Sequence, residues 1–253
     1  MHRSSPLGRA PSRWRDSAGC PPISADRFAA QYTALRRREG WIGPSGREDP
    51  DGGDPHLWAR RLQSVSRAAA ALRREWAGRG RPVLLDIGAG GGWAARYLRD
   101  ADVIAIDLLD AEDRPGQLRV RGDMRRLPVR DASVDATLYA ASLHYAPVEE
   151  SIRESARVLR PGGVLVAVDS PMYPDRRAQA QAKARSARYY ANAGFAELAE
   201  HYHPIDVRSL RAALADTGFA VMRLDVGGSG VRWWERWRLG PSFLMARLDR
   251  GQA

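Results

Sequence analysis

Cysteine, lysine and long apolar runs are almost missing from this sequence of 253 residues. Its one cysteine, Cys20, stands before two prolines, and a single cysteine excludes a disulfide framework, a cysteine-based zinc site and a cysteine nucleophile built on it alone. No run approaches the roughly 18 apolar residues of a membrane-spanning helix, which excludes a membrane span. The Arg-rich N-terminus lacks the apolar segment of a secretory signal, so a transit peptide or a disordered tail over residues 1–22 remains, and the tail is favoured. We therefore expect a cytoplasmic protein.

Acidic residues are fewer than basic ones, and almost every basic residue is an arginine. The 40 Lys and Arg residues exceed the 30 Asp and Glu residues, which gives a formal net charge of +10, and Lys183 is the only lysine. Nucleic-acid binders gather such charge on one face. Here the arginines are scattered over every segment, a pattern typical of the codon bias of a GC-rich genome. Nucleic acid is therefore an alternative partner and not the predicted one.

Length and composition indicate an ordinary globular chain with one large core. Hydrophobic residues make up 44% and charged residues 28% of the sequence, proportions typical of globular domains. A chain of this length favours a single domain with appendages. No internal repeat is found.

The stretch 83–92 predicts a ligand-binding turn. Residues 83–87 are nearly all aliphatic and predict a buried parallel strand that ends beside Asp86. Glycines follow at 88, 90 and 92, where the missing Cβ atoms allow a sharp turn and close approach of a ligand to the main chain. A helical pattern over 91–99 comes next and offers N–H donors at its start. The dinucleotide fingerprint G-x-G-x-x-G fails, because its third glycine position falls on Trp93.

The spacing Asp-x-Gly-x-Gly-x-Gly resembles motif I of the class I S-adenosylmethionine-dependent methyltransferases. Further segments match the family in its own order: a strand ending in an acid at 103–107, Gly-Asp-x-x-x-Leu-Pro at 122–128, a strand at 134–139, Ser-Leu-His-Tyr at 142–145, and Arg-Val-Leu-Arg-Pro-Gly-Gly at 157–163. The similarity covers about residues 82–170, and the order of these motifs makes it specific. The sequence resembles the broad small-molecule group that includes ubiquinone and menaquinone biosynthesis and natural-product methyltransferases.

The resemblance implies an α/β fold: a doubly wound, mostly parallel, seven-stranded Rossmann-like sheet. Residues 81–253 would form the methyltransferase domain, residues 23–80 an N-terminal helical cap, and residues 171–205 a lid inserted after the fifth strand. The seventh strand would be antiparallel at the edge of the sheet. Only about ten residues separate Asp107 from the third strand, fewer than a parallel crossover usually needs. The adenine side of the pocket is therefore either more open than usual or covered by another segment.

Periodicity and caps predict the elements that build this fold. We expect strands at 82–87, 102–107, 118–121, 134–140, 164–168, 219–226 and 242–248. We expect helices at 24–38, 56–76, 91–99, 147–159 and 206–216, with Pro161-Gly162-Gly163 stopping the fourth. On the first helix, Tyr32 would face the cofactor or pack on an apolar stripe, and Trp41 has the same two alternatives.

Asp107 is the most specific prediction of a contact with the cofactor. An acid at the tip of the second strand can accept both ribose hydroxyls of an adenosine ligand. The alternative is that Asp107 caps a helix. By resemblance, Asp123 accepts the adenine amino group, with capping again the alternative, and the Met124 N–H lies near the ring. Asp86 would fix the glycine loop and reach the methionine ammonium group. The predicted contacts are completed by Gly88, Ala89, Gly90 and Leu108, and by Tyr139 and Ala140 under the sulfonium.

Methyl transfer requires in-line positioning, and a general base only when the acceptor loses a proton. His144 lies where the fourth strand meets its loop and is the candidate base; a packing or cofactor-side role is the alternative. Four residues of the lid are candidates for contact with the acceptor: Tyr189, Tyr190, His201 and His203. The tryptophans at 233, 234 and 237 would shape an acceptor pocket or pack a hairpin.

Two sequence features that would indicate another kind of methyl transfer are absent. Methyltransferases that act on base amino groups carry Asp/Asn-Pro-Pro-Tyr at this place, where the present sequence has Ala140-Ala141-Ser142-Leu143. No spacing typical of metal ligands appears either. The predicted function is methyl transfer from S-adenosylmethionine to a small molecule. The alternatives are an RNA or protein methyltransferase and a non-catalytic S-adenosylmethionine-binding module.

Overall fold

The structure is a computed structural model that describes residues 24–44, 46, 48, 50–78, 80–109, 117–227 and 241–249. Two groups of predictions lie outside the described residues: the N-terminal tail and the tryptophans at 233, 234 and 237.

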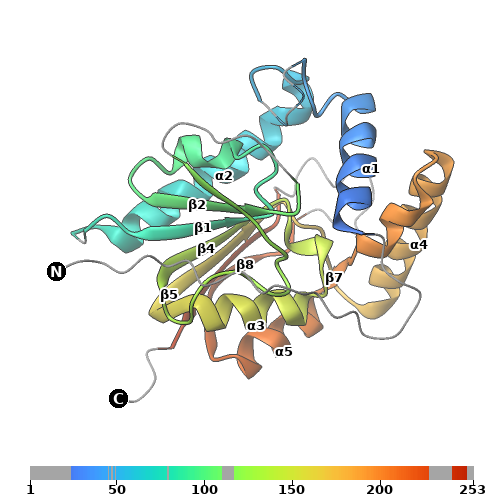
Figure 1. Cartoon of the computed structure of the whole chain (residues 1–253). Helices are drawn as coiled ribbons and strands as arrows, with labels where there is room; N and C mark the ends of the chain where they lie inside the picture. Colours follow the sequence, from blue (N-terminus) through green and yellow to red (C-terminus); the bar gives the residue numbers. More distant parts are fainter. Residues whose placement is uncertain are drawn as a thin grey trace.

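Seven strands form one sheet in the order β3-β2-β1-β4-β5-β9-β8 (Figure 1). They are β1 (Val83–Ile87), β2 (Asp102–Asp107), β3 (Leu118–Arg121), β4 (Val134–Ala140), β5 (Leu159–Val168), β8 (Phe219–Asp225) and β9 (Phe243–Leu248). The first five are parallel, and β9 is antiparallel to both β5 and β8. This is the predicted doubly wound, mostly parallel seven-stranded sheet, so the predicted fold class is confirmed.

The last strand differs from its predicted place. β9 lies between β5 and β8, so β8 and not β9 forms this edge of the sheet. The physical reason is burial: the first four residues of β9 are buried, whereas Val221 and Met222 of β8 are exposed. The more apolar strand takes the position that is covered on both sides.

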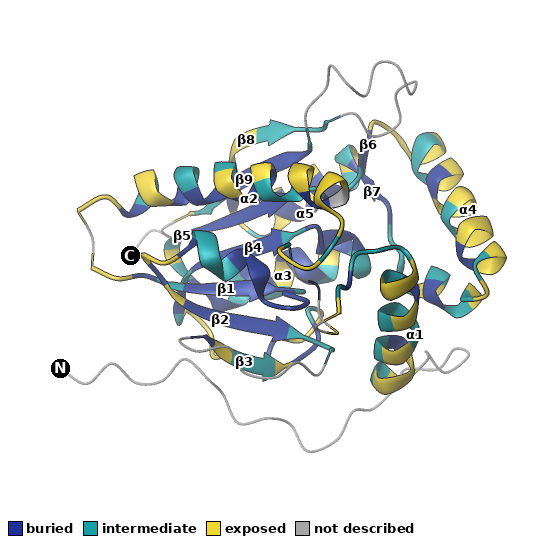
Figure 2. Ribbon diagram, turned by 90° about the horizontal axis from the view of Figure 1, so that it is seen from above, coloured by how far each residue is buried: buried dark blue, intermediate teal, exposed yellow. Residues whose placement is uncertain are grey.

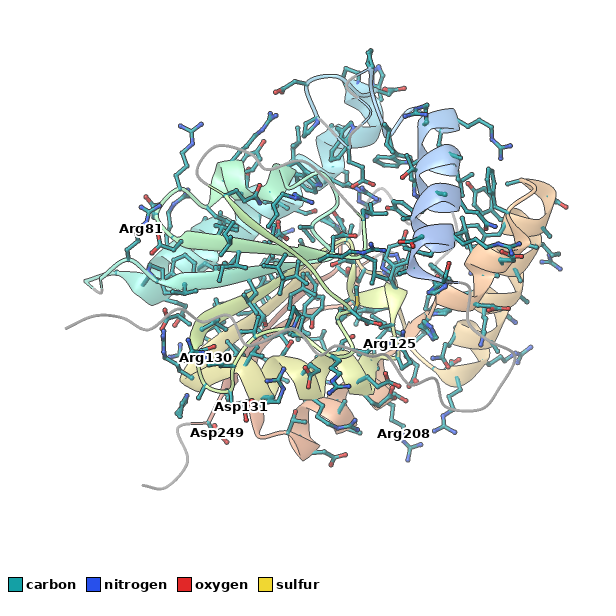
Figure 3. All side chains as sticks on the ribbon, viewed as in Figure 1. Arg81, Arg125, Arg130, Asp131, Arg208 and Asp249 are labelled. Atoms are coloured by element: carbon teal, nitrogen blue, oxygen red, sulfur yellow. The ribbon has the colours of Figure 1, made fainter. Side chains whose placement is uncertain are left out.

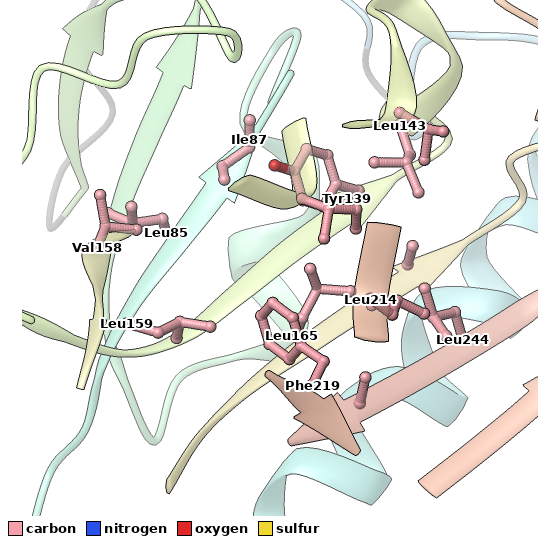
Figure 4. Close-up of a cluster of buried hydrophobic side chains, with 14 of the residues drawn as sticks. Leu85, Ile87, Tyr139, Leu143, Val158, Leu159, Leu165, Leu214, Phe219 and Leu244 are labelled. Atoms are coloured by element: carbon pink, nitrogen blue, oxygen red, sulfur yellow. The ribbon is translucent and has the colours of Figure 1, made fainter. Parts of the chain in front are cut away.

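Helices cover both faces of the sheet. On one face, α3 (Val148–Val158) and α5 (Val207–Asp216) pack on the buried cluster that Figure 4 shows in close-up. On the other face, α2 (Pro55–Trp76) packs through its own apolar side chains. Successive residues of β1 serve the two cores, with Leu84 in the second and Leu85 in the first, as the alternation of a strand requires. α2 therefore belongs to the covering layer of the sheet.

The predicted crossover helix at 91–99 is only a short 3-10 helix, η1 (Trp93–Tyr97). Its preceding residue, Gly92, is left-handed with φ of 71°, and no side chain caps the start. The space on this face is taken by α2, whose Trp58 is fully buried with its ring centroid 5.0 Å from that of Trp93. α2 thus covers the part of this face that we expected a helix at 91–99 to cover.

The segment Pro161-Gly162-Gly163 lies inside β5, although we predicted that it would stop a helix before a strand at 164. α3 ends at Val158, and the register to β4 shifts before it resumes at Ala136 opposite Val164. Gly162 has φ of 80°, and such glycines accommodate irregular strand pairing.

The remaining elements lie beyond the carboxyl ends of the parallel strands (Figures 1 and 2). They are α1 (Ala25–Arg38) and, after β5, β6 (Met172–Tyr173), α4 (Arg176–Asn192), η3 (Ala196–His201) and β7 (Ile205–Asp206). Ser24 caps α1 and Asp206 caps α5. A third buried cluster joins α1 to α4 and η3. None of the described helices is both long and apolar enough to cross a bilayer.

Candidate functional site

A cleft lies at the carboxyl ends of β1, β2 and β4, under α1 and η3. Its empty space, open mouth included, is about 1060 Å³. Its walls come from the glycine loop, the ends of β2 and β4, and the segment after β3. Three segments cover them: α1, the loop that holds Glu48, and the end of η3. The residues used below are Phe28, Tyr32, Glu48, Gly88, Gly90, Asp107, Leu108, Asp123, Met124, Ala140, Tyr145, His201 and His203.

The glycine loop has a backbone that other residues rarely adopt. Gly88 and Gly90 line the cleft with φ of 68° and 52°. A Cβ atom on Gly88 would lie 2.5 Å from Cβ of Ser142, and one on Gly90 would collide with the carboxylate of Glu48. The Ala89 N–H donates to the carbonyl of Ile106 at 3.2 Å. This predicted main-chain contact therefore faces β2, not the cleft.

Asp107 faces the cleft and also holds the glycine loop. Its Oδ2 accepts the Gly90 N–H at 2.7 Å and its Oδ1 accepts the Leu109 N–H at 2.8 Å. Burial raises the pKa of this carboxyl, and the two backbone bonds oppose that rise. Each oxygen keeps a further lone pair for a hydroxyl of a ligand. Leu108, the next residue, lines the same wall.

Asp86 lies under the loop and does not line the cleft. Its side chain is fully buried, and neither carboxylate oxygen has a hydrogen-bond partner. Burial, followed by the nearby charge of Asp107, raises its pKa to about 7. The predicted role in fixing the loop belongs to Arg119 of β3, whose Nη2 donates to the Gly90 carbonyl at 2.7 Å. Nothing in the sequence pattern of β3 singled out Arg119.

Asp123 and Met124 both line the cleft. The Asp123 carboxylate accepts the Arg125 main-chain N–H at 2.8 Å and binds the Arg125 guanidinium, with Nη2 to Oδ2 at 2.6 Å. Arg125 lies toward the end of the sheet that α1 and α4 cover, and Arg81 at the opposite end (Figure 3). Asp123 thus lies in the cleft wall and bonds within its own turn, where no described helix follows for it to cap.

The two residues at the end of β4 point to opposite faces. Ala140 lines the cleft, whereas the Tyr139 side chain is fully buried in the first core (Figure 4). The Tyr139 hydroxyl is 2.8 Å from Ser155 Oγ and donates to the Ser151 carbonyl at 3.1 Å. The structure therefore places this side chain differently from the prediction, because neighbouring side chains of a strand alternate between faces.

His144, the candidate base, is buried behind the cleft wall. Its ring packs on Tyr145 and Tyr202, with centroids 4.4 and 5.4 Å away. Burial, together with the charges of Arg36 and Arg61, lowers its pKa to about 3. A histidine with such a pKa is neutral at pH 7 but a poor proton acceptor. The surroundings of His144 therefore agree with a packing role, which is the alternative given above.

Of the four predicted acceptor residues, the structure brings only the histidines to the cleft. His201 and His203 line it. Burial lowers both pKa values, that of His203 to about 4. Tyr189 is 44% exposed, and Tyr190 packs in the third cluster. The two tyrosines therefore lie away from the cleft, on a helix that turns its polar face to solvent.

The roof of the cleft was only partly predictable. Phe28 lies 4.4 Å from His201, ring to ring, and Tyr32 meets Tyr145 edge-on at 5.7 Å. The apolar stripe of α1 identified Phe28 and Tyr32. Glu48 belongs to a Gly/Pro/Asp loop without periodicity, so no signal in the sequence pointed to it. Among the described residues, no three His, Cys, Asp or Glu side chains gather as a metal site.

Known proteins share part of the sequence and the whole architecture. A family model described as a methyltransferase domain matches residues 85–167. Malonyl-[acyl-carrier protein] O-methyltransferase of Dechloromonas aromatica is 36% identical over 94 residues, which cover 32% of this chain and 34% of that protein. The matching stretch spans about a third of the length of the curated relatives.

Solved structures extend the likeness to the whole fold. A 1,6-didemethyltoxoflavin-N1-methyltransferase of Burkholderia thailandensis, with bound 1,6-didemethyltoxoflavin and S-adenosylhomocysteine, has a TM-score of 0.52 and 19% identity, over 93% of both chains. Geranyl diphosphate methyltransferase, in complex with GPP and sinefungin, has a TM-score of 0.56 and 18% identity, over 88% of this chain and 98% of that one. The predicted resemblance to class I methyltransferases, with S-adenosylmethionine as the family's cofactor, is confirmed.

Proposed function

We propose that this chain, which carries a class I methyltransferase domain, transfers a methyl group from S-adenosylmethionine to a small-molecule acceptor. The observation that carries the proposal is the pairing of a left-handed glycine loop with the Asp107 carboxylate at one wall of the cleft. The loop leaves the main chain open to a ligand, and the acid lies at the end of the neighbouring strand, where such sheets bind adenosine ligands.

The residues at the cleft fit this cofactor. Gly88 and Gly90 line the cleft in left-handed conformations, and a Cβ at either position would collide with the side chain of Ser142 or Glu48. Asp107 would accept the ribose hydroxyls, and Asp123 with Met124 would bind the adenine, as the resemblance implies. S-adenosylmethionine, when bound, supplies an electrophilic methyl group on a positively charged sulfur.

The roof supports a small acceptor. Arg36 Nη2 donates to the Tyr145 hydroxyl at 2.7 Å, and Gln31 Nε2 donates to Glu197 at 2.8 Å, so α1 is bonded to both neighbouring segments. Aromatic rings of Phe28, Tyr32 and Tyr145 face the space beneath. A covered cleft with aromatic rings in its roof suits a small molecule with an apolar part better than the surface of a folded RNA or protein.

The chain's own contribution to the reaction is positioning and exclusion of water. Holding two reactants in line supplies much of the barrier reduction in such transfers. His201 is neutral at pH 7 because its pKa is lowered, and its buried Nε2 has no hydrogen-bond partner. That atom can accept a hydrogen bond from an acceptor hydroxyl or amine.

A labelled-methyl transfer screen tests the proposal. The purified chain is incubated with S-adenosylmethionine carrying a labelled methyl group and with cell extract separated into RNA, protein and metabolite pools. Label in the metabolite pool is the expected result. Label in RNA or protein would favour the alternative acceptors, and binding without any transfer would favour the non-catalytic module.

A further inference from the structure

Glu48 is a buried acid in the cleft wall that no cofactor contact above uses. Its side chain lines the cleft, although the residue is only 6% exposed. A bridge between Ile42 and Glu48 fixes the strand geometry of its loop. A Cβ on Gly90 would collide with Glu48 Oε2, and one on Gly91 would collide with the Glu48 main-chain oxygen. The carboxylate therefore lies directly against the loop that would cradle the cofactor.

The protein gives this carboxylate little compensation. Tyr32 donates its hydroxyl to Glu48 Oε1 at 3.0 Å. Burial and the charge of Glu48 raise the pKa of Tyr32, so the hydroxyl remains a donor. Within the described part of the chain, no arginine, lysine or histidine forms an ion pair with Glu48. A buried carboxylate without a cation is costly, which points to a cationic ligand.

Three carbonyls in and beside the glycine loop each accept a hydrogen bond from the protein. The Gly90 carbonyl accepts from Arg119 at 2.7 Å, and the Ile87 carbonyl accepts from Ser142 Oγ at 2.5 Å. The Ala89 carbonyl accepts the Gly92 N–H at 2.8 Å. An ammonium group brings three donors and no acceptor. The Glu48 carboxylate adds a charged acceptor beside this loop, which the neutral carbonyls do not provide.

We infer that Glu48 binds the α-ammonium group of the methionine part of S-adenosylmethionine, and that Tyr32 positions the Glu48 carboxylate. The inference rests on the proposed function. It assigns the amino-acid end of the cofactor to a segment outside the matched domain, since residues 85–167 do not include Glu48. Two segments far apart in sequence then share one ligand, with Asp107 at the ribose and Glu48 at the ammonium.

Calorimetry with two ligands separates this role from a structural one. S-adenosylhomocysteine carries the ammonium group, and 5′-methylthioadenosine lacks the whole amino-acid part. Glu48→Gln should raise the Kd for S-adenosylhomocysteine about 10- to 100-fold, the range expected when a bond to a charged group is lost. The Kd for 5′-methylthioadenosine should stay unchanged. Glu75→Gln is the matched control, because Glu75 is an ion-paired, partly buried acid away from this cleft.

Tyr32→Phe should produce the same split with a smaller loss, because the ring stays and only the hydroxyl that holds Glu48 is removed. Equal weakening of both ligands by Glu48→Gln would show that Glu48 merely closes the loop, and tighter binding of S-adenosylhomocysteine would show that it blocks the site. Either result overturns the inference. If the wild type binds neither ligand, the proposed function fails instead.

Discussion

At the scale of single residues, Asp107 links the cleft to the loop beside it. The same carboxylate that faces the cleft accepts the N–H of Gly90. Removing it should therefore weaken a ligand contact and loosen the glycine loop at once.

Asp107→Ala should raise the Kd for S-adenosylhomocysteine about 10- to 100-fold, because a hydrogen bond to a charged acceptor is lost. Calorimetric titration measures this change. Asp102→Ala is the control, since Asp102 lies at the other end of the same strand in an exposed pair with Arg81. Undiminished binding by the Asp107 variant would remove Asp107 from the ligand site.

Asp86 makes the stability of the fold depend on pH. Its pKa is about 7 in the folded protein and 3.8 in the unfolded reference, so the folded state binds more protons between about pH 4 and pH 7. The contribution of Asp86 to the free energy of unfolding is therefore favourable at low pH and declines as pH rises through that window.

Asp86→Asn should remove this decline, because the amide imitates the protonated acid. We expect its free energy of unfolding, relative to the wild type, to increase from pH 4 to pH 8 by up to about 4 kcal/mol. Chemical denaturation across this range measures the difference. Asp102→Asn, at an exposed site, should track the wild type; a parallel course for the Asp86 variant would show that Asp86 is ionised throughout.

The spacing of glycines and acids was enough to predict where Asp107, Asp123 and the glycine loop lie. It did not predict which atoms turn toward the cleft. Tyr139 faces the core through strand alternation, and the Ala89 N–H is used by β2. Glu48 reaches the site through a loop whose path no periodicity describes.

At the scale of elements, α1 shows what local sequence can and cannot predict. Its cap and apolar stripe predicted the helix itself. Its position depends on partners far away in the chain: Arg121 for Asp26, Glu197 for Arg27, and Tyr145 for Arg36. Such pairs follow from the folded arrangement and have no local pattern.

Glu197 joins η3 to α1 by accepting from Arg27 and Gln31. Glu197→Ala should change the free energy of unfolding by less than about 1 kcal/mol, since exposed ion pairs contribute little. It should, however, speed amide hydrogen exchange in α1 and the release of S-adenosylhomocysteine. Exchange mass spectrometry and stopped-flow dissociation measure both rates.

Asp131→Ala is the control for this change, because Asp131 forms an exposed pair with Arg157 far from α1 (Figure 3). If α1 exchanges equally fast in both variants, η3 does not hold the roof.

At the scale of the whole molecule, several of the described arginines are matched by a nearby acid. Arginines pair with acids at widely separated places on the described surface, among them Arg73, Arg81, Arg157, Arg160, Arg223 and Arg247. This distribution agrees with the scatter of arginine along the chain and offers no support for nucleic acid as the partner.

Ligand binding should stabilise the whole fold, because the cleft is assembled from segments between Phe28 and His203. S-adenosylhomocysteine at 100 times its Kd should raise the free energy of unfolding by about 2.7 kcal/mol and the Tm by roughly 5–11 °C for a chain of this size. Scanning calorimetry measures the shift. At the same concentration, Asp107→Ala should lose at least about half of it, given a 10- to 100-fold higher Kd, and an equal shift would mean that the ligand binds elsewhere.

The order of motifs predicted the topology of the parallel half of the sheet. The antiparallel half was harder to predict, because only the burial of the side chains places β9 between β5 and β8. The face covered by α2 was missed for a similar reason: helical periodicity shows that a stripe is buried, but not against which element.

During synthesis, β9 emerges from the ribosome after both strands that it pairs with. β8 leaves the exit tunnel before β9, yet it pairs with β9 and not with β5. Until residues 243–248 emerge, the nascent protein holds two strands with unsatisfied edges, and a chaperone that shields such edges would have its longest contact there.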